Sequence, residues 1–132
     1  RERKKGVAIL AALVLTFLLG DCLLKNLIQR PRPFMDMPVD LLIPAPPSYS
    51  FPSGHSSSSF AAAMILYKIR RSWGIAAFLG AGLIAFSRIF LFVHYPTDVL
   101  AGALLGILIG TAVWHGYKRF FSSKEPRKKE KE

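Results

Sequence analysis

The sequence predicts an all-α membrane protein, a polytopic bundle with four membrane-spanning helices. Hydrophobic residues make up 52% of the 132 residues. They occur in long runs, without the 3.6- or 2.0-residue periods of soluble amphipathic elements. The runs approach the ~20 residues that a helix needs to cross the hydrocarbon core of a bilayer. A chain of this length is expected to form one domain. We place this domain at residues 1–121, followed by a basic tail at residues 122–132.

The first predicted helix covers residues 6–24, which are apolar as far as Asp21 and follow a short basic flank. The next segment, residues 25–54, carries seven of the nine prolines. A regular helix does not tolerate that density of proline. We therefore expect a long loop here, with a short interfacial turn at residues 39–43. A loop of this length in a compact protein is usually functional.

Three further helices are predicted after the loop. The second begins near Ser53, a residue type that caps helix N-termini, and ends near Ile69. The third covers residues 72–92, and the fourth covers residues 96–117. Three glycines of the fourth helix recur at four-residue spacing, a pattern typical of close helix packing: Gly102, Gly106 and Gly110.

The basic residues indicate the topology of these four helices. Four lie in the N-terminal flank, three between the second and third helices, and seven at the C-terminal end, so four crossings place 14 of the 18 on one side. The positive-inside rule assigns that side, and the tail with it, to the cytoplasm. The net charge of +10 then reflects topology and affinity for anionic lipid head groups, and we expect no nucleic-acid partner. The single cysteine, Cys22, excludes an internal disulfide.

The four remaining cations lie on the outer side, where the topology rule gives them no role: Lys25, Arg30, Arg32 and Arg88. The same topology brings His55, His94 and Asp98 to that side. Ionisable residues within membrane segments mark functional sites by default. We therefore expect a single polar site at the outer face.

These residue types favour the binding of a phosphate group. Arginine offers a planar fork to phosphate oxygens and lysine a point charge. Ser53-Gly54-His55 opens a helix, whose free N–H groups and dipole attract an anion. Two histidines provide a nucleophile or base and an acid, and Asp98, four residues after His94, can orient that ring. This set of residues requires no metal and no other cofactor.

Three motifs recur in order between residues 25 and 98. They are Lys25, six residues, then Arg32-Pro33; Pro52-Ser53-Gly54-His55; and Ser87-Arg88, five residues, His94, three residues, Asp98. Together they resemble the signature of the type 2 phosphatidic acid phosphatase superfamily, the integral-membrane lipid phosphatases. The resemblance implies a six-helix family fold, so we expect that two N-terminal helices are missing from this sequence. The soluble vanadium haloperoxidases share the site, but the membrane spans argue against them.

The resemblance also implies a role for each site residue. His94 would attack phosphorus and form a phosphohistidine, and Asp98 would hold and polarise His94. His55 would protonate the leaving group and then help to activate water. The phosphoryl oxygens would be bound by Lys25, Arg32, Ser53, Gly54 and Arg88.

We therefore expect a metal-independent lipid phosphatase at the extracytoplasmic face of a bacterial plasma membrane. Undecaprenyl diphosphate is the first choice of substrate, because the run from Arg30 to Phe34 is similar to bacterial enzymes of that type. Phosphatidylglycerophosphate and phosphatidic acid are the alternatives, and a non-catalytic membrane binding protein is an alternative of another class. The expected partners are the lipid substrate and membrane lipids, and the sequence leaves the oligomeric state open. Two roles also stay open: Asp21 pairs with Lys25 or takes part in catalysis, and Arg30 touches substrate or faces head groups.

Overall fold

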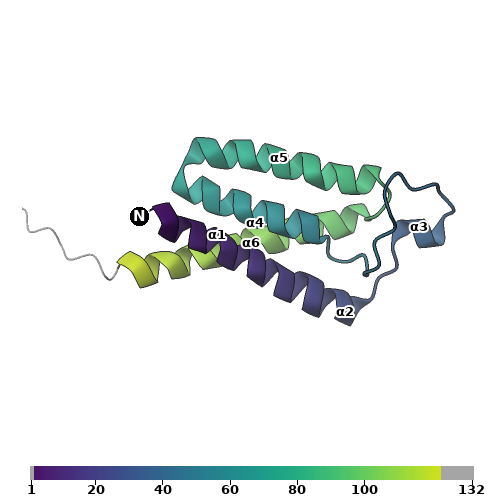
Figure 1. The fold of residues 1–132 in the computed structure, drawn as a ribbon, viewed down its shortest axis with the longest axis horizontal. Helices are drawn as coiled ribbons and strands as arrows, with labels where there is room; N and C mark the ends of the chain where they lie inside the picture. Colours follow the sequence, from purple (N-terminus) through teal and green to yellow (C-terminus); the bar gives the residue numbers. More distant parts are fainter. Residues whose placement is uncertain (1, 123–132) are drawn as a thin grey trace, which may run out of the picture.

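The computed structural model describes residues 2–122, which form helices and loops with no strand among them. Long helical rods lie side by side (Figure 1). The elements are α1 (Glu2–Thr16), η1 (Phe17–Leu24), α2 (Lys25–Ile28), α3 (Pro33–Asp36), α4 (Gly54–Ile69), α5 (Arg71–Phe90) and α6 (Pro96–Ser122). The rods are α4, α5, α6 and the continuous run of α1, η1 and α2. The all-α fold class is confirmed. The predicted tail lies outside the described residues, apart from Ser122 at the end of α6.

The first rod is longer than predicted. The α1, η1 and α2 elements follow one another without a break, so the helix ends at Ile28 rather than at Leu24. Gln29 closes it in a left-handed conformation with φ of 53°. The segment η1 is a π-helix. This wider helix is rare in proteins, and where it occurs it is often at a functional site. The proline density therefore ends the helix four residues later than predicted.

The long loop contains one short helix, but not at the predicted place. We expected a turn at residues 39–43, and the structure instead folds Pro33–Asp36 into α3. Pro33 occupies the first turn, where proline is well tolerated because its missing N–H would have no helical partner there. Residues 39–43 form bends and extended backbone.

Three helical stretches of the described chain are long and apolar enough to cross a membrane: residues 3–36, 71–90 and 96–121. The fourth rod, α4, has 16 residues and spans about 24 Å at 1.5 Å per residue. It packs against α5, α6 and α1, and so lies at the centre of the bundle. The outward faces of α1, α5 and α6 carry exposed large apolar side chains, among them Leu10, Leu83 and Leu104. Such a surface fits lipid rather than water, and the protein is a multi-pass membrane protein.

The glycines of α6 set the contact with α4. A Cβ built on Gly102 would lie 2.5 Å from the carbonyl oxygen of Ser53, and one on Gly106 would overlap the carbonyl oxygen of Ser57. The two backbones therefore touch directly, as the four-residue spacing predicts. Below this contact, small and apolar residues of α1, α4 and α6 form the core: Ala8, Ala12, Ala61, Ile65, Ile109 and Trp114.

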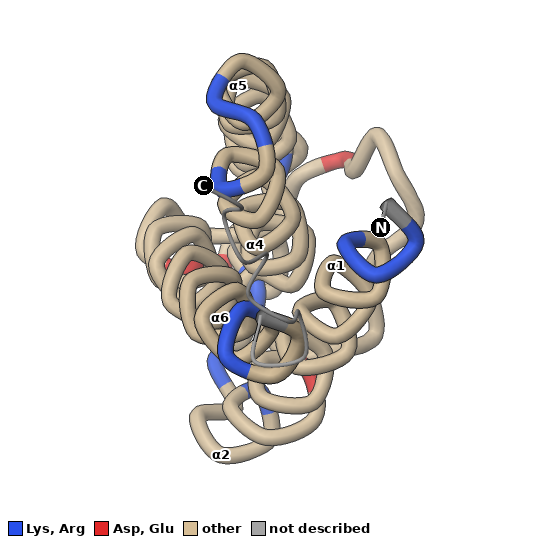
Figure 2. The backbone as a smooth tube through the Cα atoms, turned by 90° about the vertical axis from the view of Figure 1, so that its left-hand side faces the viewer, with Lys and Arg blue, Asp and Glu red and all other residues tan. Residues whose placement is uncertain are grey.

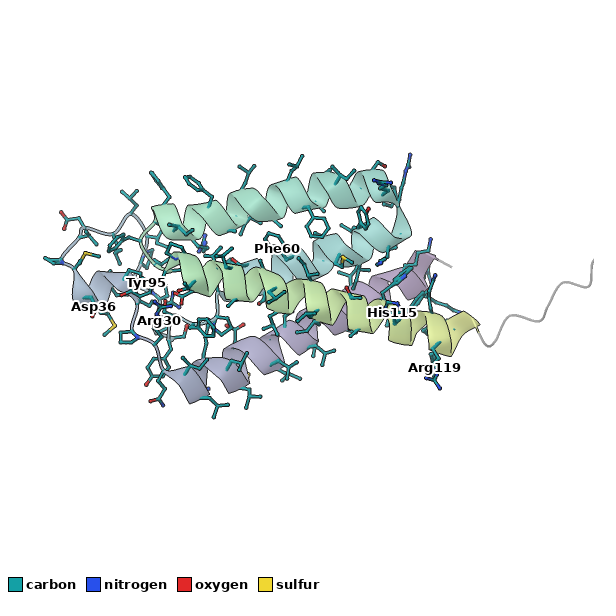
Figure 3. The ribbon with its side chains drawn as sticks, turned by 180° about the vertical axis from the view of Figure 1, so that it is seen from behind. Arg30, Asp36, Phe60, Tyr95, His115 and Arg119 are labelled. Carbon is teal, nitrogen blue, oxygen red and sulfur yellow. The ribbon has the colours of Figure 1, made fainter. Side chains whose placement is uncertain are left out.

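Within residues 2–122, the predicted cytoplasmic cations gather at one end of the bundle. Figure 2 looks onto the end where α1 begins, α4 passes into α5, and α6 finishes, and blue positions surround it. Lys4 lies 5.2 Å from the ring centroid of Phe121, which brings the two ends of the described chain together. His115 and Arg119 are at this end, whereas Arg30, Asp36 and Tyr95 are at the opposite one (Figure 3). The bundle is therefore polarised along its axis as the charge pattern predicts.

Candidate active site

A cavity of about 480 Å³ opens among the loops at the end opposite the basic one. Six of the eight predicted site residues line it: Lys25, Arg32, Gly54, His55, Arg88 and His94. Ser53 and Asp98 are fully buried behind this lining. Leu13, Thr16 and Phe17 of the first rod line it as well. The cavity therefore joins a polar site to an apolar flank of the bundle.

The first turn of α4 forms one wall. Ser53 is its N-cap, with an extended backbone (φ −70°, ψ 114°), and its hydroxyl accepts a hydrogen bond from the Ser56 N–H at 3.4 Å. The Ser53 N–H donates to the carbonyl oxygen of Asp98 at 3.0 Å. This bond ties the start of α4 to the start of α6. Gly54 and His55 follow in the first turn, where backbone N–H groups have no partner within the helix.

Arg32 is fixed in place by backbone and side-chain acceptors, although only 3% of its surface is exposed. Its Nε donates to the carbonyl oxygen of Ser48 at 2.7 Å, and its Nη2 donates to the hydroxyl of the same residue at 3.0 Å. Its Nη1 donates to the carbonyl oxygen of Val93 at 3.0 Å. The guanidinium is thus held against the loop between α5 and α6, beside His94.

The tautomer of His94 follows from its two neighbours. Its Nε2 lies 3.3 Å from Nη1 of Arg32. A guanidinium has donors and no acceptor, so Nε2 is the unprotonated, accepting nitrogen. The proton of the neutral ring is then on Nδ1, which lies 3.6 Å from Oδ2 of Asp98. That distance is longer than a hydrogen bond, and catalytic contacts of empty sites often tighten when substrate binds.

Burial favours the neutral form of His94. This residue is 4% exposed in the loop between α5 and α6, and this burial is the largest cause that lowers its pKa from the ordinary value. The charges of Arg32 and Lys25 lower the pKa further, against the opposing effect of Asp98. A neutral imidazole with an unprotonated Nε2 is the form that can act as a nucleophile.

Asp98 is fully buried, and three groups besides His94 surround its carboxylate. Nη1 of Arg30 donates to Oδ1 at 2.9 Å. The Tyr95 N–H donates to Oδ2 at 2.8 Å, and the hydroxyl of Ser50 donates to the same oxygen. The same Nη1 of Arg30 also donates to the Thr97 hydroxyl at 2.6 Å. A buried carboxylate with these partners is locked in one orientation.

Within residues 2–122, three buried side-chain atoms have no hydrogen-bond partner: Ser56 Oγ, Arg88 Nε and His94 Nδ1. Two of them belong to residues that line the cavity. Buried polar atoms without partners are rare and mark sites that receive a further group. The unsatisfied guanidine N–H of Arg88 is suited to an anion.

The comparison with known proteins agrees with this geometry. The family model of the PAP2 superfamily matches residues 5–122 of this chain. The chain belongs to the PAP2 superfamily. All three motifs of the sequence fall within the matched range, and the predicted recognition is confirmed.

Two relatives of this PAP2 chain are undecaprenyl-diphosphatases by name. It is 38% identical over 109 residues to an undecaprenyl-diphosphatase of Sulfolobus acidocaldarius. It is 34% identical over 106 residues to the undecaprenyl-diphosphatase BcrC of Bacillus subtilis. Each alignment covers 80% of this chain and 52% of the relative, so the chain spans about half the length of these curated relatives.

A solved structure has the same fold. The crystal structure of a transmembrane PAP2-type phosphatidylglycerolphosphate phosphatase from Bacillus subtilis superposes with a TM-score of 0.72 at 32% sequence identity. The superposition covers 92% of this chain and 61% of that one. The four rods are therefore arranged as in a PAP2 membrane enzyme.

The motifs found the lining of this PAP2 site but not its support. Arg30 was expected to touch substrate or face head groups, and the structure instead pairs it with Asp98 and Thr97. Ser48 and Ser50 belong to no motif, yet they hold Arg32 and Asp98. These contacts join residues 16 to 68 positions apart, and no local pattern announces them.

Proposed function

We propose that this protein is a lipid phosphatase that removes the terminal phosphate of a polyprenyl diphosphate, with His94 as the nucleophile. The observation that carries the proposal is the convergence of two histidines and three cations on one cavity. Its residues come from α2, α4, the end of α5 and the loops that precede α3 and α6. A purely structural role would not need three cations gathered around a buried histidine.

The first step is attack on phosphorus. Nε2 of His94 forms the P–N bond while the P–O bond to the lipid breaks, and His55 gives its proton to the leaving oxygen. Asp98 accepts a hydrogen bond from the Nδ1–H group of His94 and stabilises the positive charge that develops on the ring. Arg30, Ser50 and the Tyr95 N–H keep the carboxylate in place for this task.

The second step releases phosphate. A water molecule attacks the phosphohistidine, His55 accepts its proton, and the P–N bond breaks to restore neutral His94. In both steps the charge on the equatorial oxygens would be stabilised by Lys25, Arg32, Arg88 and the N-terminal turn of α4. Within residues 2–122, no group of three or more His, Cys, Asp or Glu side chains is arranged to hold a metal ion. The proposal therefore assigns that charge to protein cations.

The shape of the cavity supports a lipid substrate. Leu13 and Phe17 of the first rod line the side of the cavity away from the loops, and Phe17 is 56% exposed on the bundle surface. A lipid whose phosphate reaches His94 can leave its chain along this flank, in contact with the bilayer. The undecaprenyl-diphosphatase names of the relatives favour a polyprenyl chain.

A second substrate has its own support. The superposed crystal structure is that of a phosphatidylglycerolphosphate phosphatase, so phosphatidylglycerophosphate is the alternative substrate of the same site.

The basic end of the bundle supports an orientation with that end in the cytoplasm and the site at the extracytoplasmic face. The oligomeric state is not part of the proposal.

The test is phosphate release by the purified full-length protein in detergent with excess chelator. We expect release that survives chelation, fastest with undecaprenyl diphosphate and slower with phosphatidylglycerophosphate and phosphatidic acid. A reversed ranking would reassign the substrate within the same mechanism. Release that stops on chelation would overturn the metal-free mechanism, and no release from any of the three lipids would favour a non-catalytic binding protein.

A further inference from the structure

A carboxylate stands inside a cavity that is built for an anion. Asp21 lines the cavity together with Lys25, His55 and Arg88. Its Oδ1 lies 2.6 Å from Nζ of Lys25, one helical turn later in the first rod. The mechanism above gives Asp21 no role, and a fixed negative charge at this place opposes the binding of phosphate.

The backbone brings Asp21 close to the first turn of α4, the proposed phosphate-binding turn. The residue lies in the π-helical segment η1, which changes the direction of side chains relative to a regular helix. A Cβ built on Gly54 would be 2.8 Å from Oδ1 and 3.0 Å from Oδ2 of Asp21. The carboxylate therefore lies against the first turn of α4, where free N–H groups attract an anion.

Asp21 thus contacts two of the groups that a bound phosphate needs, the Lys25 ammonium and the start of α4. The Lys25 side chain is 8% exposed and the Asp21 side chain 29%. A nearly buried ammonium without a partner is costly, so the pairing stabilises the site while it is empty. A phosphate that enters must share or displace the same partner.

We propose that Asp21 is a positioning residue that competes with the phosphoryl group for Lys25, and thereby weakens the binding of the phosphate product. This inference rests on the proposed function, because it concerns how the same site lets its product go. The charges of Arg32 and Arg88 alone would hold a phosphate dianion tightly. The internal carboxylate returns to Lys25 as phosphate leaves, and so favours an open site for the next substrate.

A second cavity supports this role. It has a volume of about 630 Å³, lies on the loop side, and shares Asp21, Lys25 and Arg32 with the first. Most of its remaining lining comes from the proline-rich loop and α3, including Phe34 and Tyr49. The Asp21–Lys25 pair thus lies in the wall that both cavities share. A change of partner at Lys25 would alter the side of the site from which a small product can depart.

The experiment measures the affinity of inorganic phosphate for the full-length protein and for Asp21→Asn. Affinity is taken both from competitive inhibition of lipid hydrolysis and from direct titration calorimetry, which needs no turnover. We expect Asp21→Asn to bind phosphate at least about tenfold more tightly, the size of effect that one neighbouring charge has on an ion. We also expect a lower kcat where phosphate release limits turnover. Damage to the fold would weaken binding, so a gain in affinity separates the two explanations.

Asp40→Asn is the matched control, because it removes the same charge from an exposed loop residue that lines neither cavity. We expect its phosphate affinity to equal that of the wild type. Asp21→Ser carries the same expectation as Asp21→Asn and replaces it if the asparagine variant does not fold. In a Lys25→Gln background, Asp21→Asn should change the affinity much less, because the competition acts through the lysine.

An unchanged or weaker phosphate affinity in both Asp21 variants would overturn the inference, as would an equal gain in Asp40→Asn. A tighter affinity in a protein that hydrolyses none of the lipids would support the competition of Asp21 with phosphate for Lys25 but remove the proposed function. Normal hydrolysis with no gain in phosphate affinity would support the proposed function and overturn the inference about Asp21. A protein that binds no phosphate in either form contradicts both.

Discussion

His94 and His55 face the same cavity but are held in opposite ways. His94 is 4% exposed and lies between Arg32 and Asp98, each of which has further partners of its own. His55 is exposed in the first turn of α4, and within residues 2–122 its ring makes no hydrogen bond. The difference fits their proposed roles. A nucleophile must meet phosphorus in one orientation, whereas an acid must follow a leaving group and then a water molecule.

The largest expected effect comes from the removal of the fixed ring. We expect His94→Ala to lower kcat by about 10⁴-fold or more, because no other group can form the P–N bond. Phosphate release from the preferred lipid measures it. His115→Ala is the control, since His115 is exposed on α6 at the far end of the bundle (Figure 3). Near-normal turnover in His94→Ala would show that the nucleophile is elsewhere.

The exposed ring should matter less, and in a way that depends on the substrate. We expect His55→Ala to lower kcat for the lipid by about 10²- to 10⁴-fold, the usual contribution of a general acid. A nitrophenolate leaving group departs without being protonated. The rate at which a nitrophenyl phosphate ester forms the phosphoenzyme should therefore be almost unchanged in His55→Ala. Rapid-mixing measurement of the nitrophenolate burst tests this. An equal loss of the burst would place His55 in binding rather than in proton transfer.

The support of His94 can be loosened without touching the ring. We expect Arg30→Gln to reduce kcat by about tenfold, because Asp98 would lose a charged partner that orients it. Unfolding should become easier by about 1 to 3 kcal/mol, a value reduced from that of a fully buried pair because the Arg30 side chain is 33% exposed. Thermal denaturation and steady-state kinetics measure the two effects. Unchanged values in both would show that Ser50 and the Tyr95 N–H suffice.

The smallest expected effect is on the pH profile. Burial lowers the pKa of His94 from its ordinary value of 6.5, so the folded protein favours the neutral ring at pH values where a free histidine would already be protonated. We expect kcat/KM to stay nearly constant as the pH falls from neutrality to 6.5, and to decline only below it. A plot of log kcat/KM against pH checks this. A decline centred above pH 7 would mean that the neutral ring is not favoured.

The sequence predicts much of this molecule because the main constraints are local. Apolar runs, prolines and glycine spacing place the four rods, and three motifs contain six of the residues that line the cavity. The ends of the helices were less accurate, since η1 and α2 extend the first rod and α3 replaces the turn expected at residues 39–43. The support of the site was out of reach. Arg30 meets Asp98 across 68 positions, and only the folded loop brings them together.

The glycines of α6 also determine how closely α4 and α6 approach each other at the site. Gly102 lies one helical turn after Asp98, and a Cβ there would press on the carbonyl oxygen of Ser53, the N-cap of α4. The distance between the starts of α4 and α6 therefore depends on the absence of a side chain at Gly102. Even an alanine there would push the turn that we propose binds phosphate away from Asp98, the proposed partner of His94.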